Sequence, residues 1–310
     1  MRKKLIISIV TSIFLLFLIY LLDSNLAKFP HLEDQGAAWY FWKLPKATLL
    51  GTITSWGGYL IHQIIVFAYI INRKKYKDSS KYTNRFLLLN LFFVVLHIIQ
   101  THLFYDGLAQ YVPVWSSQYS VIIMLSISLI LLQPRRGFIL ARWRTIPKTT
   151  TAFFSKYHGL YISWALIYTF WFHPTEGDIA ILIGFAYMFL LFVHMSMLKT
   201  KLHTNIKWIT VLETFVVIHG VGIALMNKQE IWPMFLTGFL FMFVFTYMYG
   251  LGLNKIIRII IYILYFSLIL YLYYFRGYSK IYEVLFIPVT LYGVSLLLLG
   301  MTKVFISFKK

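Results

Sequence analysis

Long apolar runs recur along the whole 310-residue chain, and they constrain its fold more than any other feature. A helix needs about 20 apolar residues to cross a hydrocarbon core about 30 Å thick. Because backbone polar groups find no water at that depth, a helix, which pairs them internally, is the expected structure. The runs predict an all-α fold, a single integral membrane domain built as a polytopic bundle of about ten transmembrane helices. The expected helices are approximately residues 5–22, 47–72, 86–105, 112–133, 157–173, 179–198, 208–226, 232–250, 256–275 and 281–302.

Composition narrows the class of protein and the chemistry open to it. Hydrophobic residues make up 60% of the chain and charged residues 13%, whereas soluble domains carry roughly 25% charged residues. The chain has no cysteine, which excludes disulfides, thiolate metal sites and iron–sulfur clusters. The cofactor is therefore left open, with iron, zinc and haem as candidates that other side chains would have to hold.

The distribution of basic residues predicts the topology. With the N-terminus inside and the helices alternating, 23 of the 29 Lys and Arg residues fall in cytoplasmic segments, as the positive-inside rule requires. We expect a multi-pass protein of the cell membrane with both termini in the cytoplasm. A net charge of +19 would suggest nucleic acid in a soluble protein. Here the expected partners are membrane lipids, with anionic headgroups on the cytoplasmic side, and no nucleic acid.

One cytoplasmic loop is expected to hold structure of its own. Residues 134–156 contain a run from Phe138 to Arg144 in which aromatic, aliphatic and basic side chains alternate closely. This pattern predicts a short amphipathic helix that lies in the membrane interface.

Three histidines fall at one predicted depth near the middle of the bilayer. His62, His97 and His219 lie eleven or twelve residues from the basic edges of their runs, hence about 16–18 Å deep. Asn90 and Thr101 share a helix face with His97, and such polar stripes face the bundle interior because lipid exposure is costly. These histidines are the predicted cofactor-binding residues. Metal or haem ligation, proton relay and hydrogen bonding between helices all remain open for them.

A second group lies closer to the cytoplasmic side and supplies the predicted catalytic residues, Glu213, His158 and His194. Glu213 is six residues inside Lys207, about 9 Å deep. A carboxylate at that depth must be protonated or paired, and His194 is the candidate partner.

A third group, at the outer ends of two helices, has the spacing of a metal site. His102 and Asp106 are four residues apart, and His173 and Glu176 are three apart. Each pair places two ligands on one face, and two His with two carboxylates suit zinc, manganese or iron. The alternative is that these are ordinary hydrated residues at helix ends, with Pro174 marking a helix stop.

Two functions from different classes follow from this map. The first is a membrane enzyme in which a His-rich metal or haem site acts on a lipid or quinone-like substrate, a small hydrophobic molecule. The second is a proton-coupled secondary transporter that uses Glu213 and the intramembrane histidines. Both rest on the rule that ionisable groups inside a bilayer usually serve a function.

Overall fold

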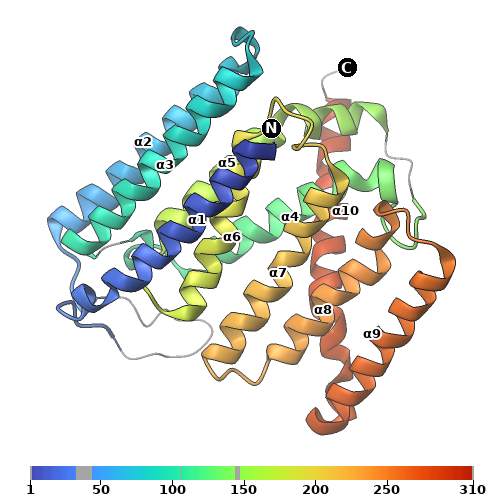
Figure 1. The fold of residues 1–310 in the computed structure, drawn as a ribbon. Helices are drawn as coiled ribbons and strands as arrows, with labels where there is room; N and C mark the ends of the chain where they lie inside the picture. The colour runs from blue at the N-terminus through green and yellow to red at the C-terminus, as the bar shows by residue number, and fades with distance from the viewer. Residues whose placement is uncertain (1, 33–43, 106, 144–146, 309–310) are drawn as a thin grey trace. The chain divides into compact units, whose positions relative to one another are not determined.

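The structure, a computed structural model, describes residues 2–32, 44–105, 107–143 and 147–308. These residues are predominantly helical, which confirms the prediction of an all-α bundle (Figure 1). The α-helices are α1 (Arg2–Leu22), α2 (Leu49–Ile71), α3 (Ser79–Phe104), α4 (Val114–Arg136), α5 (Lys148–Phe172), α6 (Ile179–Ser196), α7 (Ile206–Met226), α8 (Trp232–Phe245), α9 (Lys255–Arg276) and α10 (Phe286–Ser307).

Within the described residues, nine helical segments are long and apolar enough to cross a membrane, so the chain is a multi-pass membrane protein. The remaining helix, α5, begins at Lys148, nine residues before the predicted run, and its first half is polar. Its last turn is apolar and lies in the core, since Phe170, Trp171 and Phe172 are all fully buried. The helix is thus longer than its apolar run because a polar N-terminal extension continues the same helical path.

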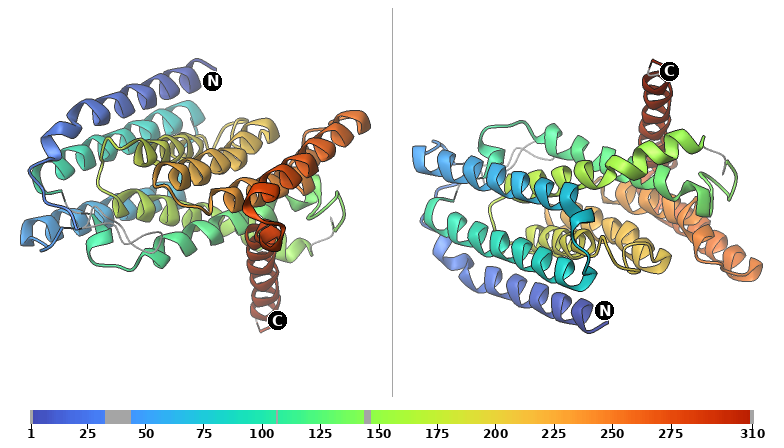
Figure 2. Two further views of the ribbon diagram at one scale, coloured as in Figure 1. Left: turned by 90° about the horizontal axis from the view of Figure 1, so that it is seen from below. Right: turned by 90° about the horizontal axis from the view of Figure 1, so that it is seen from above.

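The chain divides into two compact units, and unit 1 comprises Met1–Val121 and Gly159–Thr204. In this unit α1 packs on α6, and α3 packs on both α2 and α6 (Figures 1 and 2). The two sides of α1 differ in how deeply their side chains are buried. Val10, Phe14 and Phe17, spaced by four and three residues, are exposed, whereas Leu15 and Ile19 are buried. One stripe of α1 therefore meets lipid while the other meets protein.

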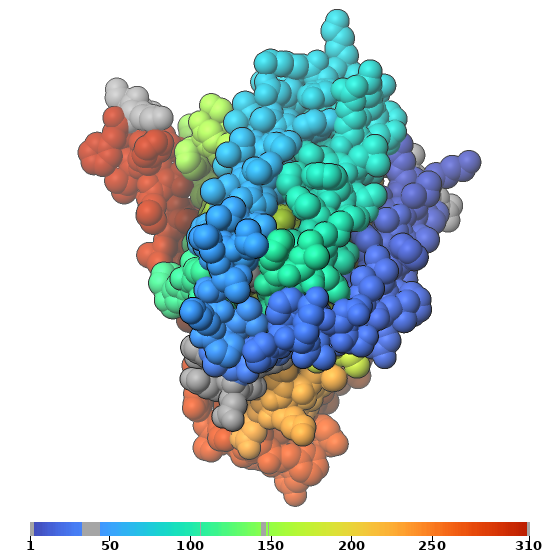
Figure 3. Space-filling view, turned by 90° about the vertical axis from the view of Figure 1, so that its left-hand side faces the viewer, coloured from blue at the N-terminus to red at the C-terminus, as the bar shows by residue number. Residues whose placement is uncertain are grey.

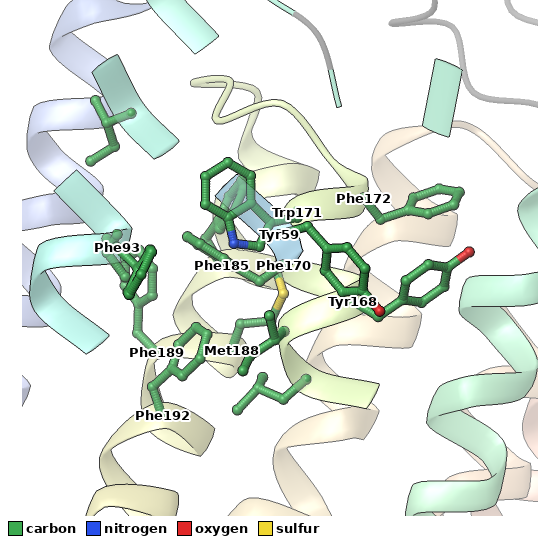
Figure 4. Close-up of a cluster of buried hydrophobic side chains, with 14 of the residues drawn as sticks. Tyr59, Phe93, Tyr168, Phe170, Trp171, Phe172, Phe185, Met188, Phe189 and Phe192 are labelled. Carbon is green, nitrogen blue, oxygen red and sulfur yellow. The ribbon is translucent and has the colours of Figure 1, made fainter. Parts of the chain in front are cut away.

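The core of unit 1 is rich in aromatic side chains. Figure 4 shows Trp171 and Phe170 of α5 among Phe93 of α3 and Phe189 and Phe192 of α6. Aromatic side chains bury about 150–250 Å² each and dominate the packing energy of a core. The C-terminal half of α5 is therefore the hydrophobic centre of this unit.

Unit 2 comprises Ile122–His158 and Asn205–Lys310. Here α8 is central, since α7, α9 and α10 all pack against it. Figure 2 shows α10 crossing the common direction of α7, α8 and α9. Polar contacts support the packing within this unit: Ser295 on α10 donates a hydrogen bond to the Ser126 carbonyl of α4 (3.3 Å).

The predicted amphipathic helix at 138–144 is wrong for residues 138–143, the part of it that the structure describes. These residues form a tight turn closed by an isolated bridge between Ile139 and Arg142. Leu140 and Ala141 have φ angles of 51° and 59°, in the left-handed region that a right-handed helix excludes. The alternation of side-chain types suggested a helical face, but the backbone turns back after the end of α4.

The contact between α2 and α5 gives a stability prediction. A Cβ atom at Gly58 would lie 2.2 Å from the Trp171 ring, whereas nothing lies within 4 Å of the corresponding position at Gly57. Gly58→Ala should lower the thermal midpoint in detergent by the equivalent of about 1–3 kcal/mol relative to Gly57→Ala. The two variants gain the same helix propensity, so their difference reports the clash alone. Equal midpoints would contradict the packing described here.

Candidate functional site

A side pocket in unit 1, with a volume of about 320 Å³, lies between α1, α3 and α6. This volume is at the lower end of the range for small-molecule sites. In Figure 3, α1 is dark blue and α3 is teal. The lining residues are Lys4, Ile7, Ser8, Thr11, Ser12 and Leu15 from α1, Asn84, Leu87, Leu88, Asn90, Leu91 and Val94 from α3, and Phe189, Phe192, Val193 and Ser196 from α6.

The wall of this pocket is mostly apolar, but three buried polar side chains interrupt it, Ser12, Asn90 and Ser196. The Asn90 amide donates a hydrogen bond to the Ser196 hydroxyl (2.9 Å). The Ser196 hydroxyl in turn donates to the Phe192 carbonyl (2.8 Å). The Asn90 and Ser196 side chains are nearly inaccessible to solvent. The pocket thus has a polar floor at the point where α3 meets α6.

Behind the floor, His62 completes a chain of hydrogen bonds. The Trp171 indole N–H donates to His62 Nδ1 (3.2 Å). Because Nδ1 accepts, a neutral His62 carries its proton on Nε2, and Nε2 donates to Asn90 Oδ1 (3.2 Å). His62 also stacks on Phe93, with ring centroids 4.1 Å apart. Trp171, His62, Asn90 and Ser196 therefore link α5, α2, α3 and α6 in one network.

One end of the pocket is basic. Lys4 lines it near the start of α1 and donates to the hydroxyl (2.6 Å) and the carbonyl (3.3 Å) of Ser80 at the start of α3. A lysine ammonium has three hydrogens, and Ser80 supplies both of the acceptors that Lys4 has among the described residues. The Asp78 carboxylate also interacts with Lys4 and Lys81, so these three groups together carry a net positive charge. This end of the pocket therefore has a donor to offer an anion.

His97 is also fully buried and engaged with the protein. Its Nε2 donates to the His173 carbonyl (2.8 Å), and the Gln100 side-chain amide lies 3.1 Å from its Nδ1. The burial of His62, His97, Asn90 and Thr101 agrees with the polar stripes that the sequence predicts. Both ring nitrogens of each of these histidines meet protein atoms, which is the pattern of a structural network. The third midplane histidine, His219, is half-buried on α7 and belongs to unit 2.

Glu213 is paired, as its predicted depth requires, and the partner in the structure is Arg136. The guanidinium of Arg136 contacts both carboxylate oxygens of Glu213, at 2.5 and 2.7 Å. Ser128 donates a further hydrogen bond of 3.4 Å to the same carboxylate. Arg136 is fully buried and lies over the Tyr247 ring, 4.5 Å from its centroid. The pair ties α4 to α7 within unit 2.

The other two predicted catalytic residues have partners other than this ion pair. His158 donates to the Ser155 carbonyl (2.8 Å) one turn earlier in α5. His194 belongs to unit 1 and stacks on His203, with ring centroids 4.4 Å apart. The predicted catalytic set of Glu213, His158 and His194 is therefore divided between the two units.

Between α5 and α6 in unit 1, Glu176 meets two aromatic partners rather than a set of metal ligands. Tyr105 donates a hydrogen bond to its carboxylate, and His31 Nε2 lies 3.4 Å from the same oxygen. Burial raises the pKa of Glu176 to about 7; the Tyr105 hydrogen bond opposes this, and Asp23 and Asp178 add to it. Burial also lowers the pKa of His31, with Asp23 opposing. Both shifts move these side chains toward their neutral forms.

The predicted metal set is dispersed among different partners. His102 Nδ1 donates to the Ile98 carbonyl (2.8 Å), and His173 Nδ1 donates to the Thr169 carbonyl (3.0 Å). Asp106 lies outside the described residues. Within the described part of the chain, no three His, Asp or Glu side chains are grouped so that they could hold a metal ion.

Comparison with known proteins adds no name to this site. No protein-family model, curated protein or solved structure matches the chain.

The buried ion pair gives a second prediction. Removal of one partner leaves an uncompensated buried charge, which costs about 3–5 kcal/mol, whereas apolar replacement of both partners is often neutral. Arg136→Met and Glu213→Leu should each lower the thermal midpoint strongly, and the double variant should recover most of the loss. Arg135→Met, at the exposed neighbour, controls for the loss of one positive charge. A double variant that is as unstable as the sum of the singles would refute the pairing.

The raised pKa of Glu176 gives a prediction for pH dependence. An acid whose pKa is raised from 4.5 to about 7 on folding binds more protons in the folded state between these pH values. Its stabilising contribution is therefore complete below pH 4.5 and is lost as the pH rises to about 7. The difference in thermal midpoint between wild type and Glu176→Gln should move in favour of wild type as the pH falls through this window. A difference that does not change with pH would count against the burial of this carboxyl.

Proposed function

We propose that the protein is a lipid-binding membrane protein that takes the chain of an anionic lipid into the pocket between α1, α3 and α6. The observation that supports this most is a single cavity that combines apolar walls, a buried polar floor and a lysine at one end. An amphiphile has the same distribution of chemistry along its length. An apolar wall takes the chain, and an ammonium group attracts a phosphate or carboxylate.

The dimensions of the pocket fit a chain rather than a compact ligand. Its lining on α1 extends from Lys4 to Leu15, eleven residues and hence about 16 Å along the helix axis. On α3 it extends over a similar length, from Asn84 to Val94. Lys4 contacts Ser80, so α1 and α3 have their basic ends at the same level. A chain that enters beside Lys4 would therefore lie along both helices.

The charge around the entrance favours an anion. The segments expected on the cytoplasmic side carry 23 of the 29 basic residues, and we place the Lys4 end of the pocket on that side. Anionic lipids are enriched in the cytoplasmic leaflet, and each basic residue near its surface contributes about 1 kcal/mol of attraction. Lateral entry from that leaflet is therefore the route that we propose.

This proposal keeps one part of the enzyme hypothesis, the hydrophobic ligand of lipid or quinone-like type. The metal or haem part has no support from the described residues, because His62 and His97 contact protein atoms through both ring nitrogens. The transporter hypothesis relied on Glu213 as a proton carrier. A carboxylate held by two hydrogen bonds from Arg136 suits a fixed structural link better.

Lipid binding can be tested with two neighbouring substitutions on α1. Thr11 lines the pocket, whereas its neighbour Val10 is 59% exposed and does not line it. Thr11→Trp should fill the cavity and reduce binding of phosphatidylglycerol, measured by native mass spectrometry, by at least tenfold. Val10→Trp adds the same side chain to the same helix and should leave binding unchanged.

The role of the Lys4 charge is tested with a separate variant and a second lipid. Lys4→Gln should weaken phosphatidylglycerol binding by about tenfold or more, the value of one charge-assisted hydrogen bond. It should leave the binding of diacylglycerol, which has no anionic group, unaltered. Equal loss of both lipids, or binding that survives in Thr11→Trp, would overturn the proposal.

A further inference from the structure

The Asn90 side chain has one more hydrogen-bond donor than the protein uses. An amide nitrogen carries two hydrogens, and the Asn90 nitrogen has one acceptor among the described residues, the Ser196 hydroxyl. Asn90 is only 3% exposed and lines the pocket. A buried donor without an acceptor is destabilising. The second hydrogen is therefore available to an acceptor that a ligand brings.

The orientation of this amide is fixed from both sides. Trp171 donates to His62 Nδ1, so His62 Nε2 is the donor and Asn90 must present its oxygen to it. Ser196 donates its own hydrogen to the Phe192 carbonyl, so its oxygen is free to accept from the Asn90 nitrogen. If the amide were flipped, its N–H groups would face the N–H of His62 Nε2, and neither group would have an acceptor there. The nitrogen of Asn90 consequently remains on the side of α6.

Resting on the proposed lipid-binding function, we propose that Asn90 selects a lipid whose chain carries a carbonyl oxygen part-way along its length. A saturated chain offers no acceptor to the amide hydrogen. A keto or similar carbonyl oxygen accepts one hydrogen bond without bringing a donor of its own. The pocket would thus distinguish an oxygenated chain from a plain hydrocarbon chain.

The helix geometry also sets where that oxygen should lie. Lys4, which would hold the anion, contacts Ser80 at the start of α3. Asn90 is ten residues further along the same helix, hence about 15 Å from that level. The ester carbonyls of a glycerophospholipid are only a few bonds from the phosphate and do not reach this depth. The acceptor should therefore be a group within the chain itself.

A positional series of oxo-octadecanoates, with octadecanoate as the plain reference, tests this inference on the full-length protein in a neutral detergent. Each acid is assayed by displacement of a bound fluorescent fatty acid. The tightest binding should occur when the keto group lies about 15 Å from the carboxylate. That compound should bind roughly five- to tenfold more tightly than octadecanoate, the value of one net hydrogen bond.

Substitutions locate the effect at Asn90. Asn90→Leu should remove the difference in affinity between the oxo compound and octadecanoate. Asn84→Leu is the matched control, because Asn84 lines the same pocket on the same helix but is exposed to solvent. It should retain the preference.

The possible results separate this inference from the proposed function. If octadecanoate and every oxo-octadecanoate bind wild type equally, the selection by Asn90 is refuted and lipid binding stands. If no member of the series binds and Thr11→Trp changes nothing, the lipid-binding function itself is refuted. The comparison of ligands on wild type needs no variant, so misfolding of Asn90→Leu would not obscure the answer.

Discussion

The structure of unit 1 depends on the chain of hydrogen bonds from Trp171 through His62 and Asn90 to Ser196. Polar side chains in a hydrocarbon environment must find partners, because no water is present to solvate them. Each of these four residues belongs to a different helix, so satisfying them fixes α5, α2, α3 and α6 against one another. The aromatic core around Trp171 then excludes water from the same network (Figure 4).

The pocket is a consequence of this arrangement. The network holds α3 against α6, while α1 packs on α6 through its buried stripe. The space between α1 and α3 is therefore left to apolar side chains from three helices, with the polar floor at its base and Lys4 at its end. A surface that joins these features along one line has the chemical layout of an amphiphile, which is why we favour binding of a lipid over bound-metal chemistry.

The sequence predicts the helices and the buried faces well, because both depend on local periodicity. The polar stripe with Asn90, His97 and Thr101 could be placed inside the bundle from spacing alone. The partner of Glu213 could not be predicted. Arg136 is 77 positions away and stands among the basic residues of a predicted loop, whereas α4 in fact continues through Pro134 and carries Arg136 into the interior. Pairing across helices depends on packing order, which a periodic pattern does not encode.

The same limit applies to the histidines of equal predicted depth. His62 and His97 both contact Trp171 in unit 1, whereas His219 belongs to unit 2. Depth along the sequence says nothing about which helices are neighbours. Whether a lipid chain lies between α1 and α3 over the Asn90 floor can be seen in an experimental structure determined in lipid nanodiscs that contain phosphatidylglycerol. We expect continuous chain-like density in the pocket with its headgroup beside Lys4. A pocket closed by direct contact of α1 with α3, with no such density, would contradict this expectation.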